Sequence, residues 1–251
     1  MSGHSKWSTI KHKKAAKDAK RGKVFTKIIR EIMVAAREGG SDPDHNAKLR
    51  NVVSKAKKEG LSMENITRAC KKGAGELDGE SYEAIIYEGF GPSGVAILIE
   101  SLTDNRQRTV AEVRHILSKH NGSLGTPGSV SRMFNSKGLL IFSCEATTED
   151  QLMETLLDAG VEDISKNEED QFEVTCAPES LDDVINAADA TKIEYVSAEL
   201  TKIPTVTVKI EGDDISRMFK IMDLLDDNDD VQNIYANFDV SSEDLAALGL
   251  G

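Results

Sequence analysis

The spacing of hydrophobic residues changes at Gly79, and this change divides the chain into a helical part and a mixed part. Before Gly79, hydrophobic residues recur every three or four positions, as on one face of a helix. The clearest series is Phe25, Ile28, Ile29, Ile32, Met33 and Ala36. After Gly79, short runs rich in Val, Ile and Tyr alternate with helical spacing. The chain therefore cannot be all-α or all-β.

The first part predicts three short amphipathic helices that follow a lysine-rich arm. Gly39-Gly40 ends the first helix, and Asp42-Pro43 supplies an N-cap and a proline at the first position of the second. The second helix stops at Gly60, and Ser62 caps a third that ends before Gly73. We therefore expect a small helical bundle, with residues 73–79 as a linker.

The second part predicts an α/β arrangement with an insertion. Residues 139–201 are expected to form strand, helix, strand, strand, helix and strand, which is the order of a ferredoxin-like unit. The expected bounds are 139–144, 148–159, 161–166, 171–176, 178–190 and 193–201. The flanks supply strands 82–88 and 95–102 with helix 106–120, and strands 205–210 and 231–238 with helix 215–225. Neither flank can bury a sheet alone, so we expect the two to join.

The predicted fold class is therefore α+β multidomain. It comprises an N-terminal three-helix bundle with a basic arm, then two ferredoxin-like α/β domains, one inserted in the other. The expected domains are residues 1–78, a discontinuous domain of 79–129 and 204–240, and an inserted acidic domain of 130–203. Residues 242–251 are expected to be a frayed tail.

The charge is strongly segregated. The formal net charge is -12, yet residues 1–75 hold 19 Lys and Arg against 7 Asp and Glu. Residues 141–251 hold 6 basic and 28 acidic residues. Such asymmetry indicates a polyanionic partner for the basic end. The acidic domains could contact a basic protein.

The basic arm carries the densest run of candidate contacts. Ten basic residues stand against Asp18 alone in the first thirty positions, too many for the polar face of one packed helix. They predict nucleic-acid binding, with a solvated basic face as the alternative. Trp7 could stack on an unpaired base or anchor the arm. The candidates here are Lys6, Trp7, Lys11, Lys13, Lys14, Lys17, Lys20, Arg21, Lys23 and Lys27; the tenth basic residue is Arg30.

The sequence gives little support for an enzyme, a metalloprotein or a membrane protein. No catalytic motif is present, and the three cysteines lack CxxC spacing, so we expect no catalytic residues, cofactor, metal or small-molecule substrate. The longest clean apolar run, Val95–Ile99, is too short to span a bilayer, and no apolar segment follows the cationic start. Residues 89–94 match GxGxxG, but a strand follows them, so we expect a hairpin turn. We expect a cytoplasmic protein, and a monomer because no heptad repeat is seen.

Three further segments are candidates. Residues 103–109 cross from strand to helix, where Arg106 and Arg108 either contact nucleic acid or form surface ion pairs beside a helix cap. Residues 122–131 form a glycine-rich loop that is functional or simply a turn. The pairs Asp226-Asp227 and Asp229-Asp230 lack the pattern of a calcium loop, so we expect a solvated turn there.

Several stretches resemble the YebC/PmpR family over nearly the whole chain. They are residues 3–32, 42–50, 87–94 (YEGFGPSG), 103–109 (TDNRQRT) and 121–130 (NGSLGTPGSV). The resemblance implies a non-enzymatic, cytoplasmic probable transcriptional regulator with a helical domain and two α/β domains. It also implies kinship with mitochondrial translational activators of cytochrome oxidase, and with factors that relieve ribosome stalling on proline-rich stretches. The family supplies no catalytic residues.

Two functions remain open at this stage. In the first, the protein regulates transcription by binding DNA, with the helices between residues 46 and 70 as a helix-turn-helix variant. Asn65, Thr67 and Arg68 are then the candidates for reading base edges. In the second, it is a ribosome-associated translation factor whose lysines track rRNA or tRNA phosphates without reading sequence. A ligand sensor or enzyme built on the α/β modules is a remote third, supported by fold analogy alone.

Overall fold

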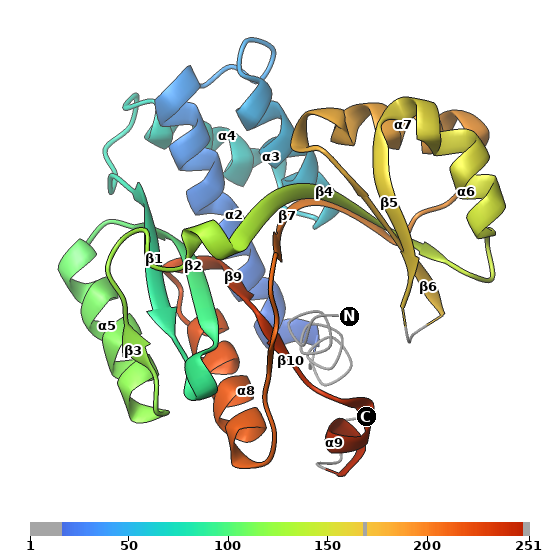
Figure 1. Cartoon of the computed structure of the whole chain (residues 1–251). Helices are drawn as coiled ribbons and strands as arrows, with labels where there is room; N and C mark the ends of the chain where they lie inside the picture. The colour runs from blue at the N-terminus through green and yellow to red at the C-terminus, as the bar shows by residue number, and fades with distance from the viewer. Residues whose placement is uncertain (1–16, 168–169, 248–251) are drawn as a thin grey trace. The chain divides into compact units, whose positions relative to one another are not determined.

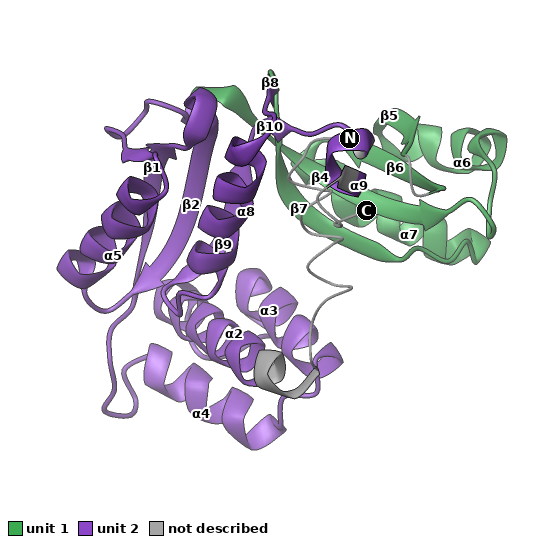
Figure 2. Cartoon of the chain, turned by 90° about the horizontal axis from the view of Figure 1, so that it is seen from below, with its two compact units in different colours: residues 1–2, 132–207 green, residues 3–131, 208–251 purple. Residues whose placement is uncertain are grey.

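The computed structural model describes residues 17–167 and 170–247, and it shows an α+β multidomain fold, as predicted. The described chain divides into two compact units (Figure 2). Unit 1 comprises residues 132–207, and unit 2 comprises the described residues on either side of it. Within the described ranges, no helix is long and apolar enough to cross a membrane.

Three helices open unit 2. They are α2 (Lys17–Gly39), α3 (Ala47–Lys58) and α4 (Met63–Gly73), and α2 packs against both of the others (Figure 1). The apolar stripe predicted on α2 is buried among residues of α3 and α4, which confirms the helical spacing. The centre of this core consists of Ile28, Ile32, Ala35, Leu49, Val53, Ala56, Ile66 and Ala69.

The caps of these helices are partly as predicted. Ser62 caps α4, and its hydroxyl accepts the Asn65 backbone N–H at 3.3 Å. The prediction that Asp42-Pro43 begins the second helix is wrong. The cap is Asn46, whose Oδ1 accepts the Leu49 N–H at 3.0 Å. Asp42 instead accepts the Asp44 N–H, because a short Asx turn ends before the helix starts.

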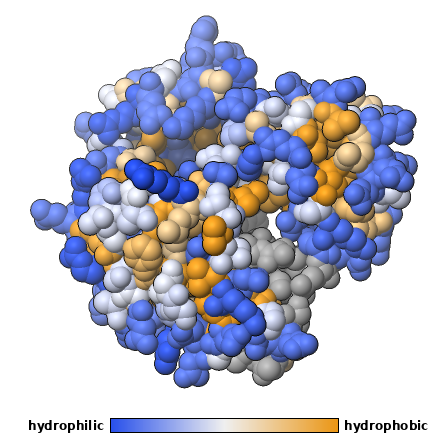
Figure 3. Space-filling model, viewed as in Figure 1, coloured by the Kyte–Doolittle hydropathy of each residue, from blue (hydrophilic) through white to orange (hydrophobic). Residues whose placement is uncertain are grey.

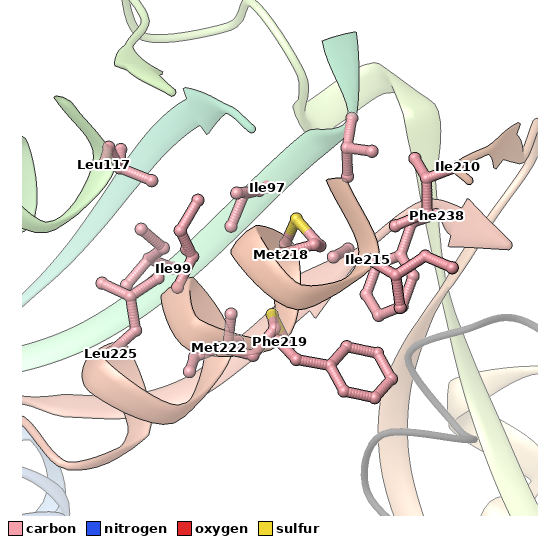
Figure 4. Close-up of a cluster of buried hydrophobic side chains, with 14 of the residues drawn as sticks. Ile97, Ile99, Leu117, Ile210, Ile215, Met218, Phe219, Met222, Leu225 and Phe238 are labelled. Atoms are coloured by element: carbon pink, nitrogen blue, oxygen red, sulfur yellow. The ribbon is translucent and has the colours of Figure 1, made fainter. Parts of the chain in front are cut away.

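The rest of unit 2 is built on an antiparallel sheet with strand order β3-β1-β2-β9. The strands are β1 (Glu83–Phe90), β2 (Ala96–Thr103), β3 (Ser123–Leu124) and β9 (Val231–Ala236). Helices α5 (Arg106–Lys119) and α8 (Asp213–Asp226) contribute to its core. Figure 4 shows Ile97 and Ile99 of β2 meeting Met218 and Met222 of α8. The two flanks therefore share one core.

The end of the chain differs from the prediction. The strand expected at 205–210 is reduced to β8 (Val208–Lys209), which pairs in parallel with β10 (Phe238–Asp239). The frayed tail expected after residue 241 is wrong in its first part, because α9 (Ser242–Ala247) is helical. Leu245 is buried in the core of unit 2, and this contact holds the helix in place.

Unit 1 has the predicted order of elements. They are η2 (Ser131–Met133), β4 (Phe134–Ser143), α6 (Glu149–Leu156), η3 (Leu157–Ala159), β5 (Val161–Lys166), β6 (Gln171–Cys176), η4 (Pro178–Ser180), α7 (Leu181–Thr191) and β7 (Ser197–Pro204). The strand order β5-β6-β4-β7 is that of a ferredoxin-like sheet. Its core is separate from those of unit 2.

Candidate nucleic-acid interface

The predicted basic arm falls mostly outside the described residues. Lys6, Trp7, Lys11, Lys13 and Lys14 lie there entirely. The backbone of residues 17–21 belongs to α2, but the side chains of Lys17, Lys20 and Arg21 also lie outside the described part. Their role as phosphate contacts stays a prediction.

Lys23 and Lys27 are the predicted arm residues whose side chains the structure places. Lys23 Nζ lies 2.7 Å from Asp227 Oδ1, and Lys27 Nζ lies 3.4 Å from Asp226 Oδ1. Hydrogen bonding to Asp227 is the main cause that raises the pKa of Lys23. Both lysines therefore hold α2 against the connection between α8 and β9, and any phosphate contact by them remains a prediction.

The expected solvated turn at residues 226–230 is wrong, because three of its carboxylates bind cations of α2. The third pair joins Arg30 Nη1 to Asp230 Oδ1 at 2.9 Å. The Arg30 guanidinium also lies 5.0 Å from the centre of the Tyr82 ring. Asp230 is buried, since its side chain is only 4% exposed.

Asp230 is the centre of a hydrogen-bonded cluster. Arg108 Nη2 donates to both of its carboxylate oxygens, at 2.9 and 2.7 Å, and Thr109 Oγ1 donates at 2.6 Å. Thr103 Oγ1 lies 3.2 Å away. Burial opposes ionisation, but the bonds from Thr109 and Arg108 outweigh it and hold the pKa of Asp230 below its usual value. The charge of Asp230 is thus balanced inside the fold.

The segment 103–109 therefore has a structural role for most of its residues. Asn105 caps α5 by accepting the Arg108 backbone N–H at 3.1 Å. Arg108 is committed to Asp230 and, at 2.8 Å, to Asp104. Arg106 is exposed and lies 3.5 Å from Glu83. These contacts match the alternative of a cap with ion pairs, and nucleic-acid contact by either arginine stays a prediction.

The glycine-rich loop 121–131 is fixed by a residue that the sequence did not single out. The carboxylate of Glu88, on β1, accepts backbone N–H groups of Gly128 at 2.7 Å, Val130 at 2.6 Å and Ser131 at 3.0 Å. Burial opposes its ionisation, but these bonds prevail and lower the pKa of Glu88. No local pattern reveals such an acceptor, because the donors lie forty residues further along.

Helices α3 and α4 offer cations that the fold leaves available. Across residues 47–73 there are eight Lys and Arg and two Glu. Several are exposed and form no ion pair with a described carboxylate. They are Arg50, Lys57, Lys58, Arg68, Lys71 and Lys72. Figure 3 shows a mainly hydrophilic surface over these helices in that view.

The candidate base readers lie on α4. Thr67 and Arg68 are exposed and Asn65 is half-buried. Arg68 Nη2 donates to Asn65 Oδ1 at 2.8 Å, so the two side chains contact each other. Their hydrogen-bonding groups remain at the surface, where the Asn65 amide and the rest of the guanidinium can act as donors. No group of three or more potential metal ligands exists among the described residues.

Comparison with known proteins decides the family. The model of the TACO1/YebC protein N-terminal domain matches residues 5–76, and that of the TACO1/YebC second and third domain matches residues 82–238. The chain belongs to the TACO1/YebC family. The predicted resemblance is thereby confirmed.

Relatives in the TACO1/YebC family match along their whole length. A probable transcriptional regulatory protein of Geobacter sulfurreducens is 55% identical over 99% of this chain and 100% of its own. One of Acidithiobacillus ferrooxidans is 51% identical over 99% and 98%. The crystal structure of a conserved hypothetical protein from Aquifex aeolicus has a TM-score of 0.79 at 41% identity, covering 90% of this chain and 93% of that one. The fold is therefore that of a solved relative.

Two of the stretches that resemble the family have an architectural role in this TACO1/YebC chain. The stretch 87–94 contains Glu88 and the β1–β2 turn, in which Ser93 has a φ of 57°. The stretch 103–109 surrounds Asp230 with hydroxyl and guanidinium groups. The expected hairpin at 89–94 is confirmed by the pairing of Phe90 with Ala96.

Proposed function

We propose that this protein is a non-enzymatic, cytoplasmic regulator of gene expression that binds DNA through its N-terminal helical part. The observation that carries the proposal is the basic surface of α3 and α4, where six of the eight cations are exposed and form no ion pair with a described carboxylate. The lysine-rich arm precedes it in the chain and adds to the positive charge. The relatives named as probable transcriptional regulatory proteins support the regulatory role.

In this proposal, lysines and arginines contact phosphates and fix the position of the protein on the duplex. Helix α4 then addresses base edges, with Arg68 suited to guanine and Asn65 to adenine. Helices α3 and α4 are joined by residues 59–62 and both pack on α2, as in a trihelical variant of the helix-turn-helix. The acidic α/β parts of the chain offer a surface to a basic protein partner.

One observation favours a second candidate, a translation factor bound to ribosomal RNA or tRNA. Asn65 and Arg68 contact each other, which occupies part of the groups that would read bases. The remaining cations give affinity for any phosphate backbone without sequence readout. A lysine-rich surface of this type suits folded RNA as well as duplex DNA.

Charge reversal in the arm tests nucleic-acid binding. In the variant K13E/K14E/K17E, we expect association with a random 24-base-pair duplex to be lost. For the unmodified chain, about 4–6 phosphate contacts predict a slope near -4 to -5 when log affinity is plotted against log salt. The matched control K119E/K192E/K220E changes the net charge equally at exposed sites outside the helical part. A flat salt response, or equal losses in both variants, would contradict the proposal.

A second experiment separates DNA from the ribosome. Binding is measured at one salt concentration to random duplexes, to duplexes from promoter regions of the organism's genome, and to purified ribosomes. Preference for particular promoter duplexes supports transcriptional regulation. Co-sedimentation with ribosomes, together with indifference to duplex sequence, supports the translation factor instead.

A further inference from the structure

Three cations of α2 lie on one face of the helix. Lys23, Lys27 and Arg30 are spaced by four and three residues, which brings their side chains to the same side. All three meet carboxylates from one short segment, residues 226–230, where α8 ends and β9 begins. Figure 2 shows α2 beside this end of α8.

The three ion pairs become more buried from the start of α2 inward. Lys23 and Asp227 are 46% and 65% exposed, and Lys27 and Asp226 are 17% and 26% exposed. Arg30 and Asp230 are 12% and 4% exposed. The innermost pair is also held by the Arg108 and Thr109 bonds to Asp230. The outer two pairs have no such support from Arg108 or Thr109.

We propose that the two outer ion pairs form a latch that a nucleic-acid backbone opens, while the Arg30–Asp230 pair stays closed as the pivot. The inference rests on the proposed nucleic-acid binding and adds its regulation. In the closed latch, the ammonium groups of Lys27 and Lys23 form ion pairs with the carboxylates of Asp226 and Asp227. In the open latch, phosphates take their place, so that the basic surface extends along α2 as far as Lys27.

The energies allow this exchange. An exposed ion pair such as Lys23–Asp227 contributes little to stability, and salt screens it. A phosphate backbone has a much higher charge density and releases condensed counterions when lysines bind. Opening therefore costs little and makes the ammonium groups of Lys23 and Lys27 available to phosphates.

The test removes the acidic half of the latch. In D226N/D227N, we expect roughly 2- to 30-fold tighter binding of a random 24-base-pair duplex, measured by fluorescence anisotropy, because the two charge pairs no longer need to be broken. The bonds of Lys27 and Lys23 to the carbonyl oxygens of residues 226 and 227, at 3.2 and 3.5 Å, remain. The matched control is E112Q/D229N. Glu112 and Asp229 line the same polar cleft of about 520 Å³ as Asp227, yet neither carboxylate pairs with α2. This control removes equal charge and is expected to gain less than twofold.

A second pair of variants isolates the contact itself. In a K23Q/K27Q background, D226N/D227N is expected to give no further gain, because the lysines that the asparagines would release are absent. In the unmodified chain, added duplex is expected to speed amide hydrogen exchange in residues 226–228 while Asp230 and residues 103–109 stay protected.

Each of the following results would overturn the latch, the proposed function or both. Equal affinity of D226N/D227N and the unmodified chain would overturn the latch and leave nucleic-acid binding intact. An equal gain in E112Q/D229N, or unchanged exchange at residues 226–228, would overturn it as well. Absence of binding by every variant and by the unmodified chain would overturn the proposed function, and the latch with it.

Discussion

Asp230 shows how a single carboxylate can connect distant parts of this chain. It lies immediately before β9 and accepts hydrogen bonds from Arg108 and Thr109 on α5 and from Arg30 on α2. A buried charge is tolerated only when partners replace the water that it loses. Here those partners come from α5, from α2 and, through Thr103, from β2, so the residue fixes the relative positions of three elements within unit 2.

We predict that Asp230→Asn destabilises unit 2 by about 2–3 kcal/mol, because Arg30 and Arg108 lose their anionic partner in a partly buried site. The measurement is urea unfolding followed by a probe in unit 2. Asp229→Asn is the matched control, since this neighbour is exposed, and it is expected to change stability by less than about 0.5 kcal/mol. Equal effects of the two changes would contradict the role given to Asp230.

Glu88 predicts a pH dependence with a definite sign. Its pKa is lowered in the folded state, so folding favours the ionised form. This contribution is fully present above the unfolded pKa of about 4.3 and is lost as the pH falls through the lower folded value. We expect the protection of the Gly128, Val130 and Ser131 amides against exchange, relative to an unfolded chain at the same pH, to fall selectively as the solution is acidified in that range.

Glu88→Gln checks this assignment. The amide retains one acceptor oxygen but no charge, so the same three amides should be less protected from exchange at neutral pH, and the acid dependence of their protection below pH ~4.3 should disappear. Glu83→Gln, an exposed change on the same strand, is the control. Persistent acid dependence in Glu88→Gln would assign the effect to another group.

At the scale of single residues, the sequence predicts what is local and misses what is remote. The caps Ser62 and Asn105 were predictable because their partners lie three residues away. Glu88 and Asp230 were not, because their partners lie about 40 and 120 residues away. The prediction of a solvated turn at 226–230 was wrong for the same reason.

At the scale of elements, the connection between α2 and α3 depends on Asn46. Its Oδ1 caps α3, while its Nδ2 donates to the carbonyl oxygens of Ala35 at 2.8 Å and Gly40 at 3.0 Å. The Asn46 side chain is buried, so water cannot replace the hydrogen bonds that it donates to these two carbonyl oxygens. One residue therefore begins one helix and ends another.

We predict that Asn46→Ala costs about 2–3 kcal/mol, because a cap and two buried hydrogen bonds are lost together. Ser62→Ala, which removes only an exposed cap, should cost about 1 kcal/mol. Thermal or urea unfolding of the helical part, followed by circular dichroism, measures the difference. Equal losses in the two variants would show that the hydrogen bonds from Asn46 to the carbonyl oxygens of Ala35 and Gly40 contribute nothing to stability.

Element boundaries were predictable where hydrophobic alternation is regular. The ranges 161–166 and 171–176 are those of β5 and β6. The strand expected at 193–201 is shifted to β7 (Ser197–Pro204), because its register is set by pairing with β4 and not by its own pattern. The helix α9 was missed although Ser241 is a local cap, whose Oγ accepts the Asp244 backbone N–H at 3.1 Å. The remote contribution to α9 is the burial of Leu245 in the core of unit 2.

At the scale of the molecule, the two units differ in net charge. Residues 132–207 contain 5 basic and 17 acidic residues, so the net charge of the rest is zero. Each of the three hydrophobic cores lies within one unit. The rest is neutral because the net charge of +12 in residues 1–75 offsets a net charge of -12 in residues 76–131 and 208–251. The charge segregation seen in the sequence therefore also runs through unit 2.

We predict that unit 2 folds and binds nucleic acid after residues 132–207 are replaced by a short Gly-Ser linker. The ends of this segment are adjacent, because the Thr205 N–H donates to the Met133 carbonyl at 2.8 Å. The shortened chain should bind a random duplex at least as tightly as the full chain, since 12 net negative charges are removed. Loss of binding in a folded product would place essential contacts in unit 1.

The pairing of Phe134 with Pro204 has a mechanical consequence. Unit 1 is attached to the chain through two antiparallel strands that begin and end side by side. A force that separates residues 131 and 208 therefore loads one hydrogen-bonded pair at a time, as when a zipper opens. Unit 1 should peel apart at low force, while tension along the other strands of the molecule is shared by several bonds at once.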